Sequence, residues 1–293
     1  MITPLIYLVL AFIPAGIISL VMDVWYRFQG PLGTAPFSDR LLRPPGESCR
    51  QKVEDLNNGL TELDVWILGF PSTFLLCVMS CNLTQPPTWP ISMPWAATFA
   101  LAISASLTLF SRRWILLKER DEWRLNFSGQ RAVGEMLNQL QVDGCRVFHD
   151  FQLGNDQHLG HIVVAPSGVY AVETRTRPKR TRTPHQQAHE VIYDGKSLEY
   201  PLLKDTTFLE ETRTHGRGLT EFLKANLDFA APVQPVLALP GWYVIQRGEG
   251  DVTVLNPKSI RERVITHNTP VLTSEQIQKI ARILEQKSRM LEF

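Results

Sequence analysis

Three long runs without a charged residue dominate the first third of this chain of 293 residues. They cover residues 4–22, 65–82 and 91–110. Each is about 18 to 20 residues long, the length that crosses the hydrocarbon core of a bilayer as an α-helix. Pro14 and Pro71 fall inside these runs, and a spanning helix tolerates proline where neighbouring groups satisfy the freed carbonyl. The sequence therefore predicts three transmembrane helices, rather than buried core helices of a soluble protein.

The distribution of lysine and arginine predicts how these helices are oriented. Cations occur in the segments 23–64 and 112–124, whereas the short connector 82–90 has none. They are Arg27, Arg40, Arg43, Arg50 and Lys52, then Arg112, Arg113, Lys118, Arg120 and Arg124. The positive-inside rule places 23–64 and everything after 111 in the cytoplasm. We therefore expect a multi-pass protein of a bacterial inner (cell) membrane whose soluble domain is cytoplasmic.

The composition argues against several classes of protein. The four cysteines, Cys49, Cys77, Cys81 and Cys145, form no Cys-x-x-Cys pair, so we expect neither a disulfide framework nor a zinc site. The three apolar runs lack the ionisable residues that mark the pathways of pumps and channels, so a transporter is not expected.

The remainder of the chain predicts a soluble domain with alternating elements. Apolar residues at helical spacing follow Ser128, a candidate N-cap, and Thr273 and Gln276 fit a capping box before the last helix. Strands are expected at 145–153, 161–166, 168–174, 233–242 and 251–260, a hairpin around Asp194 and Gly195, and a helix over 206–227. This order predicts an α/β (α+β) domain with a central mixed sheet. The expected organisation is a first transmembrane helix over 1–22, a cytoplasmic loop over 23–64, a transmembrane hairpin over 65–111, a juxtamembrane linker over 112–127 and the soluble domain over 128–293.

Several stretches of the soluble domain resemble one family closely. They are VGEMLNQL (133–140), VFHDFQL (147–153), HIVVAPSGVYAVETRTRPKR (161–180), VIYDGKSLEYP (191–201), VQPVLALPGW (233–242) and LNPKSI (255–260). In this order they resemble the nuclease-related domain, the NERD family, within the PD-(D/E)xK nuclease superfamily. The resemblance runs from about 128 to 285 and implies a restriction-endonuclease-like fold.

The resemblance also implies a metal-dependent phosphodiesterase site. In this class, carboxylates on a bent hairpin bind one or two divalent cations, which polarise the phosphate and supply hydroxide. Hard oxygen ligands suit Mg²⁺ or Mn²⁺. On this chain the resemblance places a helix glutamate at Glu135, the second acid at Glu173 and the cationic residue at Arg175. A glutamine of the later helix corresponds loosely to Glu210–Glu211.

Two positions depart from the family pattern in ways that weaken the chemistry. Gly160 stands where relatives carry the principal aspartate ligand, and it has no side-chain oxygen. Arg175 stands where they carry lysine; it keeps the positive charge but is poorly suited to exchanging a proton. Asp156 or Glu211 could replace a missing site residue. His161 is expected to be packed or hydrogen-bonded rather than a ligand, because successive strand side chains alternate between faces.

A basic run follows the candidate site directly. It contains Arg175, Arg177, Lys179, Arg180 and Arg182. Three interpretations are open: a clamp on nucleic-acid phosphates, a solvated loop, or adhesion to anionic lipid. Two functions follow from the sequence. One is a membrane-anchored protein that engages nucleic acid and hydrolyses it with Mg²⁺ or Mn²⁺ at a degenerate site; the other is an inactive pseudo-nuclease that serves as a nucleic-acid- or protein-binding scaffold.

Overall fold

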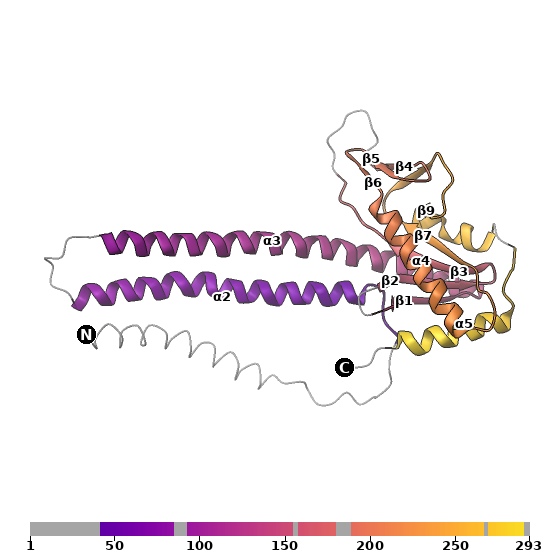
Figure 1. The fold of residues 1–293 in the computed structure, drawn as a ribbon, viewed down its shortest axis with the longest axis horizontal. Helices are drawn as coiled ribbons and strands as arrows, with labels where there is room; N and C mark the ends of the chain where they lie inside the picture. The colour runs from indigo at the N-terminus through magenta and orange to yellow at the C-terminus, as the bar shows by residue number, and fades with distance from the viewer. Residues whose placement is uncertain (1–41, 85–92, 155–157, 180–188, 267–268, 290–293) are drawn as a thin grey trace. The chain divides into compact units, whose positions relative to one another are not determined.

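The computed structural model describes residues 42–84, 93–154, 158–179, 189–266 and 269–289 (Figure 1). Of residues 68, 70–84, 93–99 and 101–102 it describes the backbone alone. The chain forms two compact units, the first of residues 1–38 and 54–121 and the second of residues 39–53 and 122–293.

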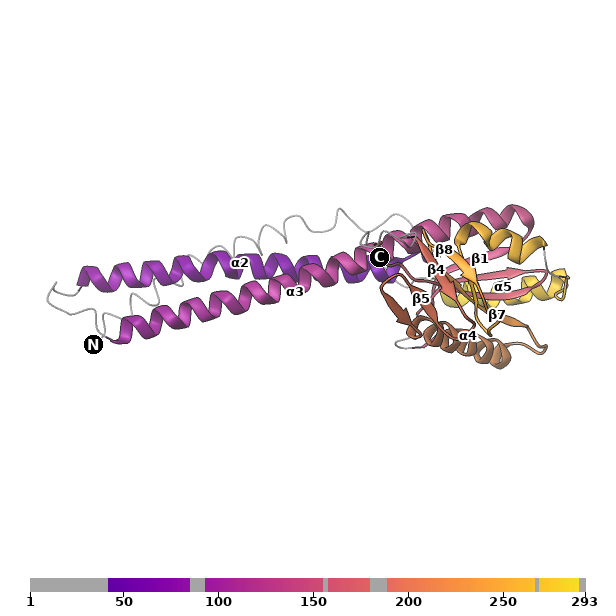
Figure 2. The ribbon, with the colours of Figure 1, turned by 90° about the horizontal axis from the view of Figure 1, so that it is seen from above.

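Two long helices build the first unit and lie side by side in both views (Figures 1 and 2). Helix α2 runs over Glu47–Thr84 and helix α3 over Met93–Asn138, and both also contribute to the second unit. The expected loop over 23–64 is therefore helical from Glu47, and the expected linker over 112–127 is part of α3. The inner face of α2 buries Leu56, Leu60 and Leu63. Their spacing of four and three residues places them on one helical stripe.

Ser128 does not begin a helix, contrary to the N-cap prediction. Helix α3 passes through this position without a break, and the Ser128 hydroxyl donates to the carbonyl of Arg124, 2.9 Å away. A mid-helix serine commonly bonds back to the carbonyl four residues earlier, so its side chain alone does not mark a helix start.

Among the described residues, no helix is both long enough and apolar enough to cross a membrane. The first predicted span, residues 4–22, lies outside the described part of the chain. The runs 65–82 and 91–110 fall on the backbones of α2 and α3, but most of their side chains lie outside the description. The transmembrane helices stay a prediction.

The second unit is a mixed α/β domain built on two mixed sheets rather than the single sheet expected. The larger sheet has the strand order β1-β2-β3-β7-β9. Its strands are β1 (Arg146–Gln152), β2 (His158–Ala165), β3 (Gly168–Thr174), β7 (Val233–Ala238) and β9 (Thr253–Leu255). The pairs β1–β2 and β2–β3 are antiparallel, whereas β3–β7 and β7–β9 are parallel. A tight turn at Pro166 and Ser167 joins the strands that the sequence predicts at 161–166 and 168–174, and Gly168 adopts a φ of 139° there.

A second, smaller sheet has the strand order β6-β5-β4-β8. Its strands are β4 (Glu190–Tyr193), β5 (Leu198–Tyr200), β6 (Leu203–Asp205) and β8 (Tyr243–Gln246). The predicted hairpin is confirmed, since β4 and β5 pair antiparallel around Asp194 and Gly195. Strand β8 was not expected; it pairs parallel with β4.

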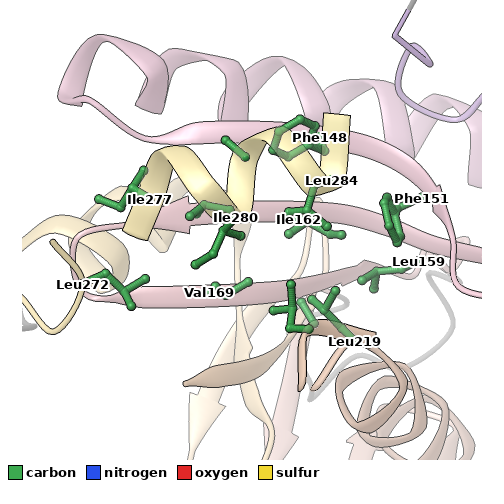
Figure 3. Close-up of a cluster of buried hydrophobic side chains, with 14 residues drawn as sticks. Phe148, Phe151, Leu159, Ile162, Val169, Leu219, Leu272, Ile277, Ile280 and Leu284 are labelled. Atoms are coloured by element: carbon green, nitrogen blue, oxygen red, sulfur yellow. The ribbon is translucent and has the colours of Figure 1, made fainter. Parts of the chain in front are cut away.

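Helices cover both faces of the larger sheet. On one face, α4 (Thr207–Asn226) and α5 (Ser274–Ser288) bury a cluster that includes Leu219, Ile280 and Leu284 against Ile162 (Figure 3). On the other face, the end of α3 and a short 3₁₀ turn, η1 (Gln139–Asp143), pack against the sheet. The residues of this second cluster include Val133, Leu137, Leu140, Val163, Tyr170 and Val172. Because both faces are covered, β2 and β3 read as nearly continuous apolar runs. The chain closes with η2 (Pro257–Ser259), the π-helical turn η3 (Glu262–Thr266) and α5, whose predicted capping box at Thr273 and Gln276 is confirmed.

Candidate functional site at the end of strand β3

Glu173 is the centre of the candidate site and lies near the end of β3. It is 3 % exposed, so its carboxylate needs partners within the protein. The backbone N–H of Gly160 donates to Oε2 over 3.2 Å, and Nδ1 of His215 donates to Oε1 over 3.0 Å. The Arg175 guanidinium lies 3.9 Å from Oε1. The buried Glu173 carboxylate therefore has two hydrogen-bond donors, one to each oxygen, and a nearby cation.

Helix α4 supplies one wall of the site. Phe208, Glu211 and His215 follow one another at spacings of three and four residues, so they share one face of the helix. Glu211 Oε2 accepts a 2.6 Å hydrogen bond from the Arg175 side chain, and the guanidinium lies 5.6 Å from the Phe208 ring centre. Arg175 is thus fixed by α4, and Glu211 acts as its ion-pair partner.

Gly160 lies directly beside Glu173 across the β2–β3 pair. A Cβ atom at this position would be 3.0 Å from Oε1 of Gln130 and 3.3 Å from Oε2 of Glu173. Gly160, where the resemblance implies an aspartate, therefore faces Glu173. It is so closely surrounded that a side chain there would have to displace the Gln130 amide.

The residue of α3 that faces the site is Gln130, not Glu135 as predicted. Gln130, Gly134 and Asn138 recur every four residues, and Gly134 and Asn138 lie close to His149. Glu135 lies about 140° around the helix from Gln130, at 100° per residue, and is exposed. The helix position next to Glu173 thus carries a neutral amide, whose Oε1 is buried and has no hydrogen-bond partner among the described residues.

The residues around Glu173 do not fit the Mg²⁺ or Mn²⁺ ion that the resemblance implies. A hard divalent cation needs several oxygen ligands, and a carboxylate can bind it only if it is not already paired with a cationic side chain. Here the one buried acid is already bound by Arg175, His215 and a backbone N–H, and its neighbours are a glycine and an amide. Among the described residues, no group of three or more histidine, cysteine, aspartate or glutamate side chains is placed to hold a metal ion.

Asp150 does not contribute to the candidate site, because its carboxylate binds Ser48 and Arg43. Its carboxylate accepts from the Ser48 backbone N–H over 3.0 Å, from the Ser48 hydroxyl, and from Arg43 over 3.3 Å. A carboxylate at the first turn of α2 also interacts favourably with the helix dipole. Asp150 has a φ of 48°, an uncommon value for a residue other than glycine. Asp156, which the sequence offers as a replacement for a missing site residue, lies outside the described residues.

His161 is buried against a second histidine, as the sequence predicts. The Nδ1 atoms of His149 and His161 lie 2.9 Å apart, and His149 Nε2 lies 3.0 Å from Oδ1 of Asn138. Because His149 Nε2–H donates to Asn138, its Nδ1 accepts and His161 Nδ1–H is the donor. Burial lowers the pKa of His149 to about 4 and the pKa of His161 well below its ordinary value. Both rings are therefore neutral at pH 7.

The first two cations of the basic run point inward. Arg177 forms an ion pair with Asp205, and its guanidinium lies 5.0 Å from the ring centres of Tyr200 and Phe208. The side chains of Arg175 and Arg177 are each 27 % exposed. Lys179 is exposed, and Arg180 and Arg182 lie outside the described residues. Arg175 and Arg177 are therefore bound to acids of the same domain instead of being presented as a phosphate clamp.

Three residues of the site were not expected from the sequence: Gln130, His215 and Asp205. Gln130 follows Gly129 just as Glu135 follows Gly134. This repeated pattern indicated two alternative positions for the helix residue that faces Glu173. His215 lies one turn after Glu211, so a helix drawn through both residues would have placed them on one face.

Comparison with known proteins gives one family. Residues 125–240 match the nuclease-related domain, NERD. This segment includes Gln130, Gly160, Glu173, Arg175 and His215, and so contains the whole candidate site. No curated protein and no solved structure matches the chain.

Proposed function

We propose that this chain is a membrane-anchored protein whose nuclease-related domain engages nucleic acid at the cytoplasmic face and does not hydrolyse it. The observation that carries the proposal is the state of Glu173, whose carboxylate is bound by His215, Arg175 and the Gly160 N–H in place of a metal ion. The match of residues 125–240 to the nuclease-related domain is the premise from which it starts.

The loss of cleavage follows from charge and access. Metal-assisted hydrolysis needs a cation that contacts both the protein carboxylates and the scissile phosphate. The Glu173 side chain is 4 % exposed and the His215 side chain 14 % exposed, so a phosphodiester cannot approach this carboxylate without movement of α4. Glu173 and Glu211 also share the one Arg175 guanidinium, so the cluster offers Mg²⁺ or Mn²⁺ little excess negative charge.

Nucleic acid as the partner is supported by the family match and by the outer part of the basic run. Lys179 is exposed, and the sequence places Arg180 and Arg182 directly after it. Cations of this kind contact phosphates without reading base sequence, so binding would weaken steeply with salt. Membrane anchoring is supported by the charge-free runs and by the distribution of lysine and arginine around them.

The proposal is tested with the full-length protein purified in detergent. Fluorescence anisotropy with labelled double-stranded DNA, single-stranded DNA and RNA at two salt concentrations measures binding. We expect salt-sensitive binding that falls in the variant Lys179→Ala, Arg180→Ala, Arg182→Ala. The matched control replaces three exposed lysines elsewhere in the same domain, Lys196, Lys224 and Lys258, by alanine and should bind like the parent.

Cleavage is measured with the same nucleic acids in Mg²⁺ or Mn²⁺. Cutting that disappears in Glu173→Gln would overturn the proposal and establish hydrolysis. Equal binding by the parent and both triple-alanine variants would reject the basic run as the contact surface, and an absence of binding by the parent would favour a protein-binding scaffold.

A further inference from the structure

Helix α3 carries a stripe of exposed apolar side chains in the first unit. Ile103, Leu107, Phe110 and Trp114 are 59 %, 65 %, 61 % and 63 % exposed. Their spacings of four, three and four residues align them along one side of the helix. A continuous apolar stripe of this kind marks a surface that another apolar phase covers.

The same level of α2 is apolar and exposed as well. Val65 and Trp66 are 52 % and 60 % exposed. They follow Asp64, whose Oδ1 accepts a 2.6 Å hydrogen bond from Nε of Arg113, the residue before Trp114. The two helices are antiparallel (Figures 1 and 2), so this ion pair brings both tryptophans to within about one helical turn of the same level.

The chemistry changes sharply at this level. Toward the connector between the helices, the described exposed side chains of α3 up to Ser111 are uncharged; they include the apolar residues of the stripe, together with Ser104, Thr108 and Ser111. Exposed Arg112 lies at this level, between Phe110 and Trp114, and in the other direction Lys118 is exposed, with its Nζ 5.5 Å from the centre of the Trp114 ring. Tryptophan next to a cation, between an apolar and a charged zone, is typical of the boundary between acyl chains and headgroups of a bilayer.

We propose that the Asp64–Arg113 ion pair marks the level at which α2 and α3 pass through the cytoplasmic headgroup layer of a phospholipid bilayer. Trp66 and Trp114 lie in the boundary region, the stripe from Ile103 to Phe110 contacts acyl chains, and Arg112 and Lys118 contact lipid phosphates. This inference rests on the membrane anchoring of the proposed function. It adds the position of the boundary, about one turn beyond the end of the apolar run at residue 110.

A bilayer fits this surface better than one partner helix does. Ile115 is 63 % exposed and lies about 100° around α3 from Trp114. With Val65 and Trp66 on α2, the apolar surface therefore extends over both helices and beyond one stripe. A single docked helix, or a second copy packed along the stripe, would leave part of it in water.

The first test measures depth in the membrane. Single cysteines at Leu107, Trp114 and Lys118 are introduced into a full-length chain whose four native cysteines are alanine, labelled with a polarity-sensitive fluorophore, and reconstituted in vesicles of phosphatidylglycerol and phosphatidylcholine. We expect position 107 to lose most fluorescence to a quencher deep in the acyl chains, 114 to a quencher near the headgroups and 118 to aqueous iodide. Lys196→Cys, exposed in the second unit, is the aqueous control.

A second measurement uses the native cysteines and protects the test against poor folding. Brominated lipid should quench the tryptophan fluorescence of the parent, and the variant Trp66→Phe, Trp114→Phe should lose a large part of that quenching. Trp242→Phe, a buried tryptophan of the second unit, should lose none.

The outcomes separate this inference from the function on which it rests. Release of the protein from membranes by alkaline carbonate would reject anchoring and the inference together. A protein that resists carbonate but shows position 114 fully aqueous or deep in the acyl chains would overturn the inference alone. So would cross-linking that places the stripe of one copy against a second copy while brominated lipid leaves Trp114 unquenched.

Discussion

Oε1 of Glu173 and Nδ1 of His215 lie 3.0 Å apart, which joins the end of β3 to the middle of α4. In the metal-dependent nucleases that the sequence resembles, an acid at this position would be free to bind a metal ion. Here the acid is part of the packing between the sheet and a helix. The candidate site is thus a structural junction of the domain, and its contribution to stability can be measured.

Removal of the histidine should destabilise the domain. His215→Ala leaves the buried Glu173 carboxylate without one donor, and we expect a loss of about 1–3 kcal/mol in the free energy of unfolding. The same change in a Glu173→Gln background should cost less, because a neutral amide is less dependent on the donor. Thermal unfolding of the parent, the two single variants and the double variant gives this coupling. Thr214→Ala, an exposed neighbour on α4, is the control, and equal costs in both backgrounds would contradict the pairing.

Restoration of the acids should create metal affinity that the parent lacks. Gly160→Asp alone is expected to destabilise the domain, because its Cβ would lie 3.0 Å from Gln130 and its charge would stand beside Glu173. Combined with Gln130→Glu and Arg175→Lys, the added acids should bind Mn²⁺ measurably by calorimetry. A matched triple variant with Glu135→Gln in place of Gln130→Glu should bind less. Equal affinities in the two triple variants would show that α3 does not face the site through Gln130.

Substitutions of Arg177 and Lys179, two residues apart, should have different effects: the first should lower stability and the second should weaken nucleic-acid binding. Arg177→Ala leaves Asp205, whose side chain is 9 % exposed, without its cation and removes contacts with two aromatic rings. We expect a loss of about 1–3 kcal/mol in stability from these changes. Lys179→Ala should leave the melting temperature unchanged and weaken nucleic-acid binding. If Arg177→Ala melts like the parent, the ion pair contributes nothing, and the arginine returns to the candidate phosphate contacts.

Local sequence patterns predicted much of the domain. The turn between β2 and β3, the hairpin at Asp194 and the capping box at Thr273 each depend on a few neighbouring residues, and all three are present. The division into two sheets was not predictable in this way. Strand β8 pairs with β4 across about fifty residues of chain, and a partner at that separation leaves no local pattern.

The candidate site was predicted only in part, for a related reason. Glu173, Gly160 and Arg175 lie on or beside one strand pair, so the sequence register brings them together. Whether Gln130 or Glu135 faces Glu173 depends instead on how helix α3 is rotated about its axis. Because α3 is continuous from Met93 to Asn138, the sequence shows no helix start near these residues from which that rotation could be derived. The contacts of Arg175 with Glu211 and of Arg177 with Asp205 depend on tertiary packing, which places the first two cations of the basic run in an internal network.

The paired histidines predict how stability changes in acid. Burial holds the pKa of His149 near 4 and that of His161 well below its ordinary value of 6.5. Below about pH 6.5 the unfolded chain therefore takes up protons that the folded domain does not, and the free energy of unfolding falls as the pH drops.

We expect that loss to begin near pH 6.5 and to continue through pH 4, with no contribution from this pair above pH 7.5. Urea unfolding of the full-length protein at pH 7.5, 6.0 and 5.0 measures the slope. The variant His149→Leu, His161→Leu removes both titrating rings and should show a shallower decline, whatever its stability at pH 7.5. His189→Gln removes an exposed histidine of the same domain and should keep the slope of the parent. A double-leucine variant that declines as steeply as the parent would mean that other groups cause the sensitivity to acid.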